Sequence, residues 1–314
     1  MKRPPQKKRA VRGECCVLGI DVGGTNIRAG LVSLPSGAVC CVRATHTEAS
    51  RGGSHALARV VALAREVAEE GAATGRSAAK VGIGVPELVD AAGRIESHCS
   101  LPWRSHQVRA RLRKFGEVTI ASDVRAAALA EARLGAGRAA TSFLYVSVGT
   151  GISCTLVLDG KPYSGAHGHA ISFASGPTYA TSGVDGKPAF EALEGRASGP
   201  GLVRRAHFLG VTAPDAVAVC RAALKGPGIA RDVVDAAATE LAIHVAILAN
   251  ALDPRLIVLG GGLGCARGRY WMTFRAALPR FTWGPYASRI QVRRAALGTQ
   301  VGIIGAALSA HEKV

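Results

Sequence analysis

The stretch Leu18-Gly19-Ile20-Asp21-Val22-Gly23-Gly24-Thr25 decides the fold of this chain. Apolar residues lead up to Asp21, two glycines follow it, and another apolar run begins at residue 26, so the pattern predicts a strand, a tight turn and a second strand. Glycine suits a turn that grips an anion, because a Cβ would block the close approach of backbone N–H groups and would disfavour a positive φ. The same letters also occur in ordinary hairpins, so one such turn is weak evidence for a ligand site.

A second stretch repeats this order of elements further along the chain. Residues 143–148 predict a strand, Gly149-Thr150-Gly151 a turn, and residues 152–158 another strand. Two copies of one supersecondary unit imply two related lobes. Two matched turns are much less common among ordinary hairpins than one, so we interpret both as phosphate-binding turns.

The glycine turns predict the parts of a nucleotide site. Gly23 and Gly24 would open the backbone to phosphate, and the hydroxyl of Thr25 would bond a phosphate oxygen. A carboxylate among phosphates needs a cation between them, so we assign Asp21 to Mg²⁺ through water. From the second lobe, the expected nucleotide contacts are Gly149, Thr150, Gly151 and the run Gly260, Gly261 and Gly262, which follows an apolar strand.

The rest of the chain alternates helical and extended patterns, which predicts an α/β protein. Residues 174–190 are rich in turn formers and are expected to form a long loop near a functional cleft. Helices are expected at residues 54–70, 104–114, 125–134, 201–209, 213–224, 229–251, 269–278 and 302–312. Further strands are expected at residues 38–42, 80–85, 118–121, 256–259 and 289–296.

Composition and charge limit the function classes. The 314 residues are 48% hydrophobic and 19% charged, which suits a globular protein of two lobes. The formal net charge is +17, and an excess of basic residues suits an anionic ligand such as ATP. Six cations and no acid lie in the first dozen residues, so we expect residues 1–14 to form a disordered, solvated tail; nucleic-acid binding is the less favoured alternative.

The cysteines and the hydropathy indicate a cytoplasmic protein. None of the eight cysteines forms a C-x-x-C pair, and several lie in apolar runs, which favours free thiols in a reducing compartment. No apolar segment follows the basic N-terminus and no stretch approaches the length of a membrane span, so neither a signal peptide nor a membrane partner is expected.

The sequence resembles the ROK family of sugar kinases, within the actin/hexokinase superfamily, from about residue 16 to residue 310. The segments that carry the resemblance are residues 18–25, 82–86, 89–90, 122–123, 126–131, 149–152, 165–168, 193–194, 197–199, 252–254, 257–262 and 302–307. The resemblance implies two ribonuclease-H-like lobes around a central cleft, ATP and Mg²⁺ as cofactors, and a homodimer. We expect the N-terminal lobe to comprise residues 15–122 and 298–314, with the last helix crossing back, and the C-terminal lobe to comprise residues 123–297.

The resemblance implies that Asp123 is the catalytic base. In the family, the Asp of an Asn-Asp pair takes the proton from the attacking hydroxyl, and a carboxylate within hydrogen-bond reach of an alcohol can do so. Alternatively, Ser122 or Asp123 only caps the helix that follows, and both roles are compatible.

The departures from the family pattern lie on the acceptor side. The Pro-Gly pair reads Pro86-Glu87, Ser122 replaces the Asn before the base, and Ser172 replaces a sugar-binding Glu. Glu194 stands where the family keeps a substrate-binding Glu, and Glu87 is either a further acceptor contact or a solvated surface residue. No cysteine lies between Cys154 and Cys220, so the family's zinc loop is missing and no zinc site is expected. His167 and His169 are then structural or face the substrate.

These observations predict an ATP-dependent kinase for a hydroxyl of a modified sugar, such as an amino sugar, or of a C7-cyclitol of the valiolone type. One alternative is a hexose kinase for glucose or N-acetylmannosamine. A catalytically impaired sugar sensor and an enzyme that only hydrolyses ATP are others. A repressor is disfavoured, because only about fourteen residues precede the first strand, too few for a helix-turn-helix.

Overall fold

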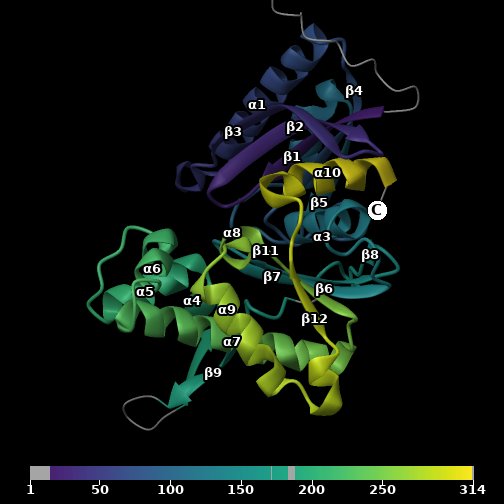
Figure 1. Cartoon of the computed structure of the whole chain (residues 1–314). Helices are drawn as coiled ribbons and strands as arrows, with labels where there is room; N and C mark the ends of the chain where they lie inside the picture. Colours follow the sequence, from purple (N-terminus) through teal and green to yellow (C-terminus); the bar gives the residue numbers. More distant parts are fainter. Residues whose placement is uncertain (1–14, 171, 183–187, 313–314) are drawn as a thin grey trace, which may run out of the picture.

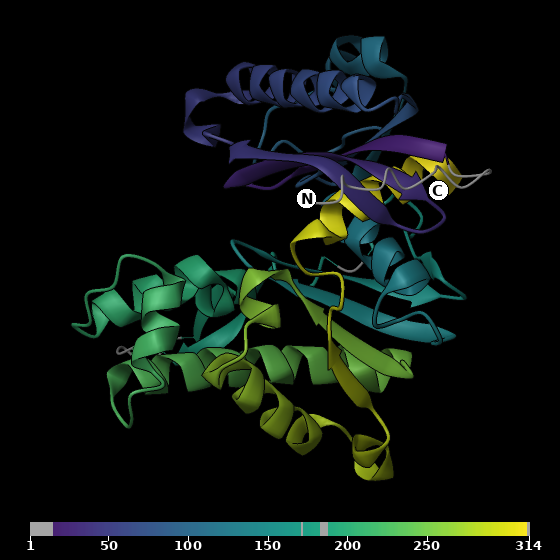
Figure 2. The same ribbon diagram turned by 45° about the horizontal axis from the view of Figure 1, so that its top comes forward.

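A computed structural model describes residues 15–170, 172–182 and 188–312. Two five-stranded sheets lie in two lobes, with α3 (Asp123–Leu134) and α10 (Val301–Glu312) between them (Figures 1 and 2). The first sheet has the order β3-β2-β1-β4-β5. Its strands are β1 (Cys15–Val22), β2 (Asn26–Leu34), β3 (Ala38–His46), β4 (Ala78–Val85) and β5 (Glu117–Ser122). The first three strands form an antiparallel meander, whereas β4 and β5 run parallel to β1.

The second sheet repeats this topology. Its order is β12-β11-β6-β7-β8, and β6, β7 and β8 again form a meander that two parallel strands extend. The strands are β6 (Ser142–Val148), β7 (Ile152–Leu158), β8 (Lys161–Pro162), β11 (Leu256–Gly260) and β12 (Gln291–Arg294). The duplication predicted from the two glycine turns is therefore confirmed at the level of the sheets.

Helices cover both faces of each sheet, which explains why the central strands β1, β4, β6 and β11 are mostly apolar and buried. On the first sheet, α1 (Gly53–Ala73) packs on Leu18 and Ile20, while α10 (Val301–Glu312) covers the opposite face around Val17. On the second sheet, α3 (Asp123–Leu134) covers one face, and the long helix α7 (Ile229–Leu252) and α9 (Arg269–Phe281) belong to the core on the other. The remaining helices are α2 (Ser105–Leu112), α4 (Leu193–Ala197), α5 (Gly199–Phe208), α6 (Ala216–Ala222) and α8 (Gly261–Cys265), with short 3-10 turns at Ala49–Arg51, Arg113–Phe115, Gly284–Ser288 and Gly298–Gln300.

Helix α10 lies unusually close to its neighbours because glycines remove the obstructing side chains. A Cβ built on Gly19 of β1 would lie 2.2 Å from the carbonyl oxygen of Ile303, and one on Gly82 of β4 would lie 1.8 Å from that of Ala306. The buried carboxylate of Glu131 in α3 accepts hydrogen bonds from the backbone N–H groups of Ala296 and Leu297, just before the chain enters α10. The segment that crosses back to the first lobe is thus tied to α3.

Two sequence expectations need correction. Residues 174–190 were expected as a loop, but β9 (Pro177–Ser182) and β10 (Pro188–Ala192) form an antiparallel hairpin; its connection, residues 183–187, lies outside the described residues. The helix expected at residues 213–224 begins only at Ala216, because the side chain of Asp215 accepts the N–H of Ala218 and caps it. The expected tail at residues 1–14 also lies outside the described part. Among the described residues, no helix is long and apolar enough to cross a membrane.

Candidate functional site

Three carboxylates gather at the carboxyl ends of three adjacent parallel strands. Asp21 lies near the end of β1, Glu87 lies two residues beyond β4, and Asp123 follows β5 directly. The register pairs Asp21 with Gly84 on β4, and a Cβ on Gly84 would lie 3.4 Å from Cα of Asp123. Ligands of open α/β sheets bind at this end of the strands, so the topology itself marks the region as a site.

The electrostatic surroundings of Asp123 suit a base. Burial raises the pKa of its carboxyl group to about 7, and the neighbouring negative charges of Asp21 and Glu87 add to the effect. The N–H of Val124 donates to Oδ1 at 2.7 Å, which favours the ionised form and fixes the side chain at the start of α3. Ser122 occupies the N-cap position but makes no side-chain capping bond. A carboxyl group that titrates near neutral pH can both accept and release a proton.

Asp21 fits the hard cation that an ATP site requires. Burial raises the pKa of its carboxyl group to about 6, and the opposing effect of Arg28 is smaller. Oxygen donors are the ligands that Mg²⁺ prefers, and a carboxylate under this desolvation penalty gains from a nearby cation. Asp21, Thr25 and Asn26 line the same cleft, so the donor chemistry is suitable.

The two glycine turns meet tip to tip. The hydroxyl of Thr25 lies 3.3 Å from that of Thr150, which brings the turns of the two lobes into contact. Each turn is closed by one backbone hydrogen bond of 2.9 Å, from Gly23 N to Asn26 O and from Gly149 N to Gly151 O. The turns predicted as separate grips therefore form one surface.

A cleft of about 1230 Å³ extends from this surface between the lobes. Seven of the predicted residues line it: Asp21, Gly23, Gly24, Thr25, Gly149, Thr150 and Gly262. Apolar side chains of the C-terminal lobe also line it, including Pro200, Val203, Val217, Leu224 and Leu263. Glycine turns and apolar side chains in one cleft suit a molecule that carries phosphates and a flat, largely apolar ring.

Gly260 and Gly261, also expected to contact a nucleotide, are not among the described residues that line this cleft. A Cβ on Gly260 would lie 2.2 Å from the hydroxyl oxygen of Tyr145, and one on Gly261 would lie 2.4 Å from the carbonyl oxygen of Val148. Gly261 also has φ of 78°, a conformation that favours glycine. Packing against β6 therefore explains both residues.

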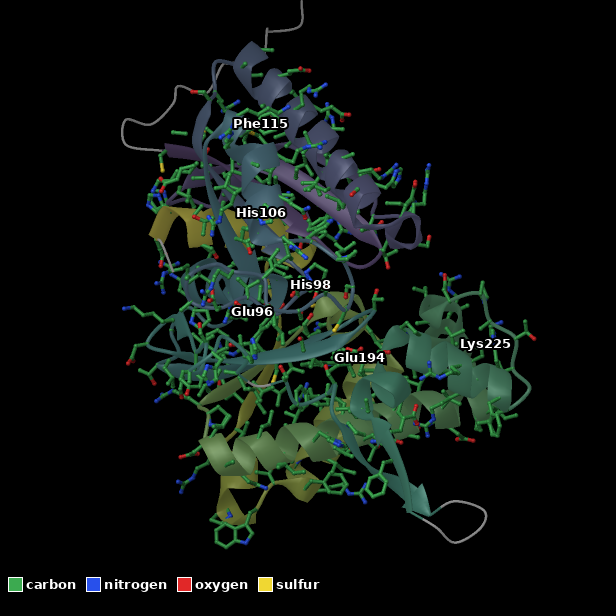
Figure 3. The ribbon with its side chains drawn as sticks, turned by 180° about the vertical axis from the view of Figure 1, so that it is seen from behind. Glu96, His98, His106, Phe115, Glu194 and Lys225 are labelled. Carbon is green, nitrogen blue, oxygen red and sulfur yellow. The ribbon has the colours of Figure 1, made fainter. Side chains whose placement is uncertain are left out.

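Glu194 supports the second glycine turn. Its Oε2 accepts the N–H of Ile152 at 2.8 Å, and a Cβ on Gly151 would lie 2.7 Å from the same oxygen. Gly151 is thus needed to let the carboxylate approach the turn. Among the described residues, no hydrogen bond is given to the other oxygen, Oε1. Figure 3 labels Glu194 on the C-terminal lobe near the level where the two lobes meet.

Glu87 is neither a free acceptor contact nor a solvated surface residue, the two alternatives that the sequence left open. It is only 5% exposed, so it is not a solvated surface residue. Both of its carboxylate oxygens accept hydrogen bonds from residues 97–101 of its own lobe, so they are already occupied and do not form a free acceptor contact.

The remaining residues expected on the acceptor side, Pro86, Ser122, His169 and Ser172, do not line the cleft. Ser122 is buried and Pro86 is partly buried beside the carboxylates. His169 and Ser172 lie on an exposed turn of the second lobe, where Ser172 Oγ donates to the carbonyl of His169 at 3.3 Å. Gly168, just before this turn, accepts a hydrogen bond of 3.1 Å from Arg125 of α3.

Sequence reasoning missed the arginines of the cleft. The arginines that line it are Arg28, Arg204, Arg221, Arg267 and Arg269, and positive charge of this kind suits an anionic ligand. Arg28 could have been found, because the hairpin predicted around residues 21–25 places it directly opposite Asp21.

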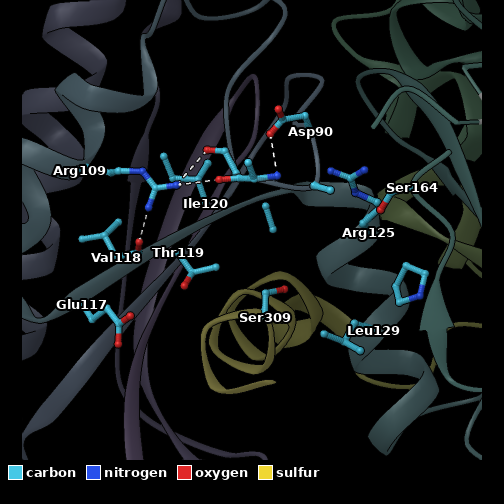
Figure 4. Close-up of a pocket in the computed structure, with 15 residues that line it drawn as sticks. Asp90, Arg109, Glu117, Val118, Thr119, Ile120, Arg125, Leu129, Ser164 and Ser309 are labelled. Atoms are coloured by element: carbon cyan, nitrogen blue, oxygen red, sulfur yellow. Dashed lines mark hydrogen bonds between the residues drawn. The ribbon is translucent and has the colours of Figure 1, made fainter. Parts of the chain in front are cut away.

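Two further observations delimit the site. A smaller pocket of about 250 Å³ lies behind β5, beside Asp90, Arg109 and Ser309, and no predicted site residue lines it (Figure 4). Within the described ranges, no group of three or more His, Cys, Asp or Glu residues could hold a metal ion. The expected absence of zinc stays a prediction.

Comparison with known proteins now adds to this geometry. Residues 17–313 match the ROK family. The chain belongs to the ROK family. The ROK hexokinase of Thermus thermophilus is 29% identical with a TM-score of 0.75, over 95% of this chain and 98% of that one. This likeness, together with the duplicated sheets, confirms the two-lobed fold.

Curated relatives agree with the expected class of enzyme. The kanosamine kinase of Amycolatopsis mediterranei is 31% identical over 256 residues, which cover 78% of this chain and 80% of that enzyme. The bifunctional enzyme NanE/NanK of Brucella melitensis is 38% identical over 192 residues, which cover 60% of this chain. That match spans 34% of the bifunctional enzyme, so the ROK chain corresponds to about a third of its length.

Proposed function

We propose that this ROK protein transfers the γ-phosphoryl group of ATP to a hydroxyl group of a sugar-like polyol. The observation that carries the proposal is the position of Asp123, which shares one site with Asp21 and has a pKa raised to about 7. The acceptor oxygen attacks the γ-phosphorus, the bond to the bridging oxygen of ADP breaks, and Asp123 takes the hydroxyl proton. The products are ADP and a phosphate ester.

The other side chains hold the reactants. Thr25, Thr150 and the backbone of the glycine turns bind the phosphates, and Arg28 supplies positive charge beside them. A magnesium ion held through Asp21 would neutralise charge on the transferred group. The apolar side chains of the cleft, including Val203 and Leu224, receive the base of the nucleotide.

For the acceptor, we propose a modified sugar, with an amino sugar preferred and a C7-cyclitol of the valiolone type as the second choice. Ser122 and Ser172 are short and neutral, so they bond fewer hydroxyl groups than an Asn and a Glu would. Oε1 of Glu194 is left for an ammonium or hydroxyl group, because Oε2 is engaged by Ile152. The similarity to a kinase whose name specifies kanosamine supports an amino sugar.

The test is a panel of acceptors with ATP and Mg²⁺, in which ADP release and the mass of the product are both measured. We expect an amino sugar with a free amino group, or a cyclitol, to have a higher kcat/KM than glucose or the acetylated N-acetylmannosamine. Glu194→Gln should lower kcat/KM for an amino sugar about tenfold more than for glucose, because a charged partner is lost. Highest turnover with glucose or N-acetylmannosamine would overturn the acceptor proposal and leave the kinase proposal intact. Sugar binding without any phosphorylated product would support a sensor instead.

A further inference from the structure

The carboxylate of Glu87 is wrapped by a loop of its own lobe. Oε1 accepts the backbone N–H groups of Ser100 and Leu101, each at 2.7 Å. Oε2 accepts the hydroxyl of Ser97 at 2.5 Å and the N–H of Cys99 at 3.1 Å. Three consecutive N–H groups therefore converge on one anion, as they do in backbone nests that bind anions.

This arrangement fixes the loop at its base and leaves its tip exposed. Leu101 and Trp103 are buried, and the indole N–H of Trp103 donates to the carbonyl of Gly53 at 2.6 Å. The three residues before Leu101, at positions 98–100, are exposed. Hydrogen bonds to a charged carboxylate stabilise a loop more than hydrogen bonds between neutral groups do. Removing the charge of Glu87 would therefore loosen the loop.

The carboxylate that anchors the loop lies near Asp123, the proposed base. Glu87 follows β4 and Asp123 follows β5, and these strands are paired neighbours through Val85 and Ser122. The two acids are close enough for the charge of Glu87 to raise the pKa of Asp123. In contrast, Glu87 does not line the nucleotide cleft. Figure 3 labels His98 on the N-terminal lobe near the level where the two lobes meet.

We propose that Glu87 is a positioning residue of the acceptor site, which holds residues 98–100 as the wall that the N-terminal lobe presents to the acceptor. It acts through the loop rather than by touching the substrate. This inference rests on the proposed kinase function, because it assigns the loop to the acceptor of that reaction.

The test compares Glu87→Gln with Glu96→Gln. The second variant removes the same charge from an exposed side chain near the same loop and serves as the matched control. In Glu87→Gln, we expect the KM for the acceptor to rise about tenfold while the KM for ATP changes less than about twofold. The acid limb of the pH profile of kcat/KM should move to lower pH, because Asp123 loses a neighbouring negative charge. The amides of Cys99, Ser100 and Leu101 should exchange hydrogen faster.

Glu96→Gln should leave all four quantities unchanged. If Glu87→Gln does not fold, Ser97→Ala replaces it. This variant removes one donor to the carboxylate and also the acceptor of the N–H of Leu88, and its acceptor KM should rise about threefold. The proposal is overturned if Glu87→Gln, or Ser97→Ala in its place, matches the control in acceptor KM and in amide exchange. Failure of the wild type to phosphorylate any acceptor would refute the kinase function instead, while the exchange measurement would still show whether Glu87 holds the loop.

Discussion

The hydroxyl of Thr25 lies 3.3 Å from the hydroxyl of Thr150, so a single pair of side chains links the glycine turns of the two lobes. We expect Thr25→Ala and Thr150→Ala each to raise the KM for ATP up to about tenfold, because we propose that each hydroxyl also binds the phosphates. The double variant should lose less free energy of ATP binding than the two single variants lose together, since the two residues are in contact.

Steady-state kinetics with ATP and acceptor varied in turn will measure this effect. Thr74→Ala is the control, because its hydroxyl donates to the carbonyl of Gly71 at the end of α1, outside the residues that line the cleft. An equal rise in the acceptor KM would contradict the assignment of the two threonines to the nucleotide.

Asp123→Asn should abolish turnover and stabilise the fold at alkaline pH. We expect kcat to fall by a factor of about 10² to 10⁴ with ATP binding retained. The native pKa of Asp123 is about 7 and its ordinary value is 3.8, so the native state favours the protonated form. This contribution to stability is complete below the lower value and is lost as the pH rises through the higher one.

An Asn side chain does not titrate, so the variant does not lose this stability as the pH rises. With a discount for partial solvent access, Asp123→Asn should raise the free energy of unfolding by about 2 kcal/mol near pH 8 and by almost nothing near pH 4. Urea denaturation at both pH values measures the difference. A gain of equal size at both would contradict the titration of Asp123, and unchanged turnover would remove its role as base.

The pH dependence of kcat/KM should show an acid limb near neutral pH. Asp123 must be ionised to accept the proton, and its pKa of about 7 predicts a tenfold fall for each pH unit below that value. Asp21 has a pKa of about 6, so the acid limb should become steeper below about that pH. The two groups titrate as a coupled pair. Initial rates at constant ionic strength test this, and a flat profile from about pH 5 to pH 8 would argue against both groups.

Gly302→Ala should damage both stability and activity. A Cβ at this position would lie 2.2 Å from Cγ of Asp21, so either the carboxylate or the start of α10 must move. We expect a loss of about 1 to 3 kcal/mol in the free energy of unfolding and a rise in the KM for ATP. Gly176→Ala is the matched control, because no heavy atom lies within 4 Å of its added Cβ. A Gly302→Ala variant as active and stable as that control would show that α10 does not constrain Asp21.

Most of the fold was predictable because it depends on a repeated local pattern. The two glycine turns, each between apolar strands, indicated the duplicated sheets directly. The hairpin at residues 177–192 was not predictable, because proline, glycine and serine are typical of loops and its strands pair only with each other. The division into lobes at residues 122 and 298 stays a prediction, since α3 packs against both sheets.

The site was predictable where residues lie at or just beyond the end of a strand. Asp21 and Asp123 converge because adjacent parallel strands end at the same edge. The partners of Glu87 are mostly backbone N–H groups ten or more residues away, which leave no pattern in the sequence. A glycine such as Gly260 gives the same signal whether a ligand or a tyrosine ring approaches it, so its role needed the structure.

The contacts of α10 also have a consequence for biosynthesis. The strands of the first sheet leave the ribosome nearly 180 residues before the helix that covers their inner face. At ordinary elongation rates this interval lasts on the order of 10 s. During that time the apolar face around Val17 and Val32 has no cover from α10 and is open to chaperones or to misassociation. The lobe that is synthesised first is therefore the one that is completed last.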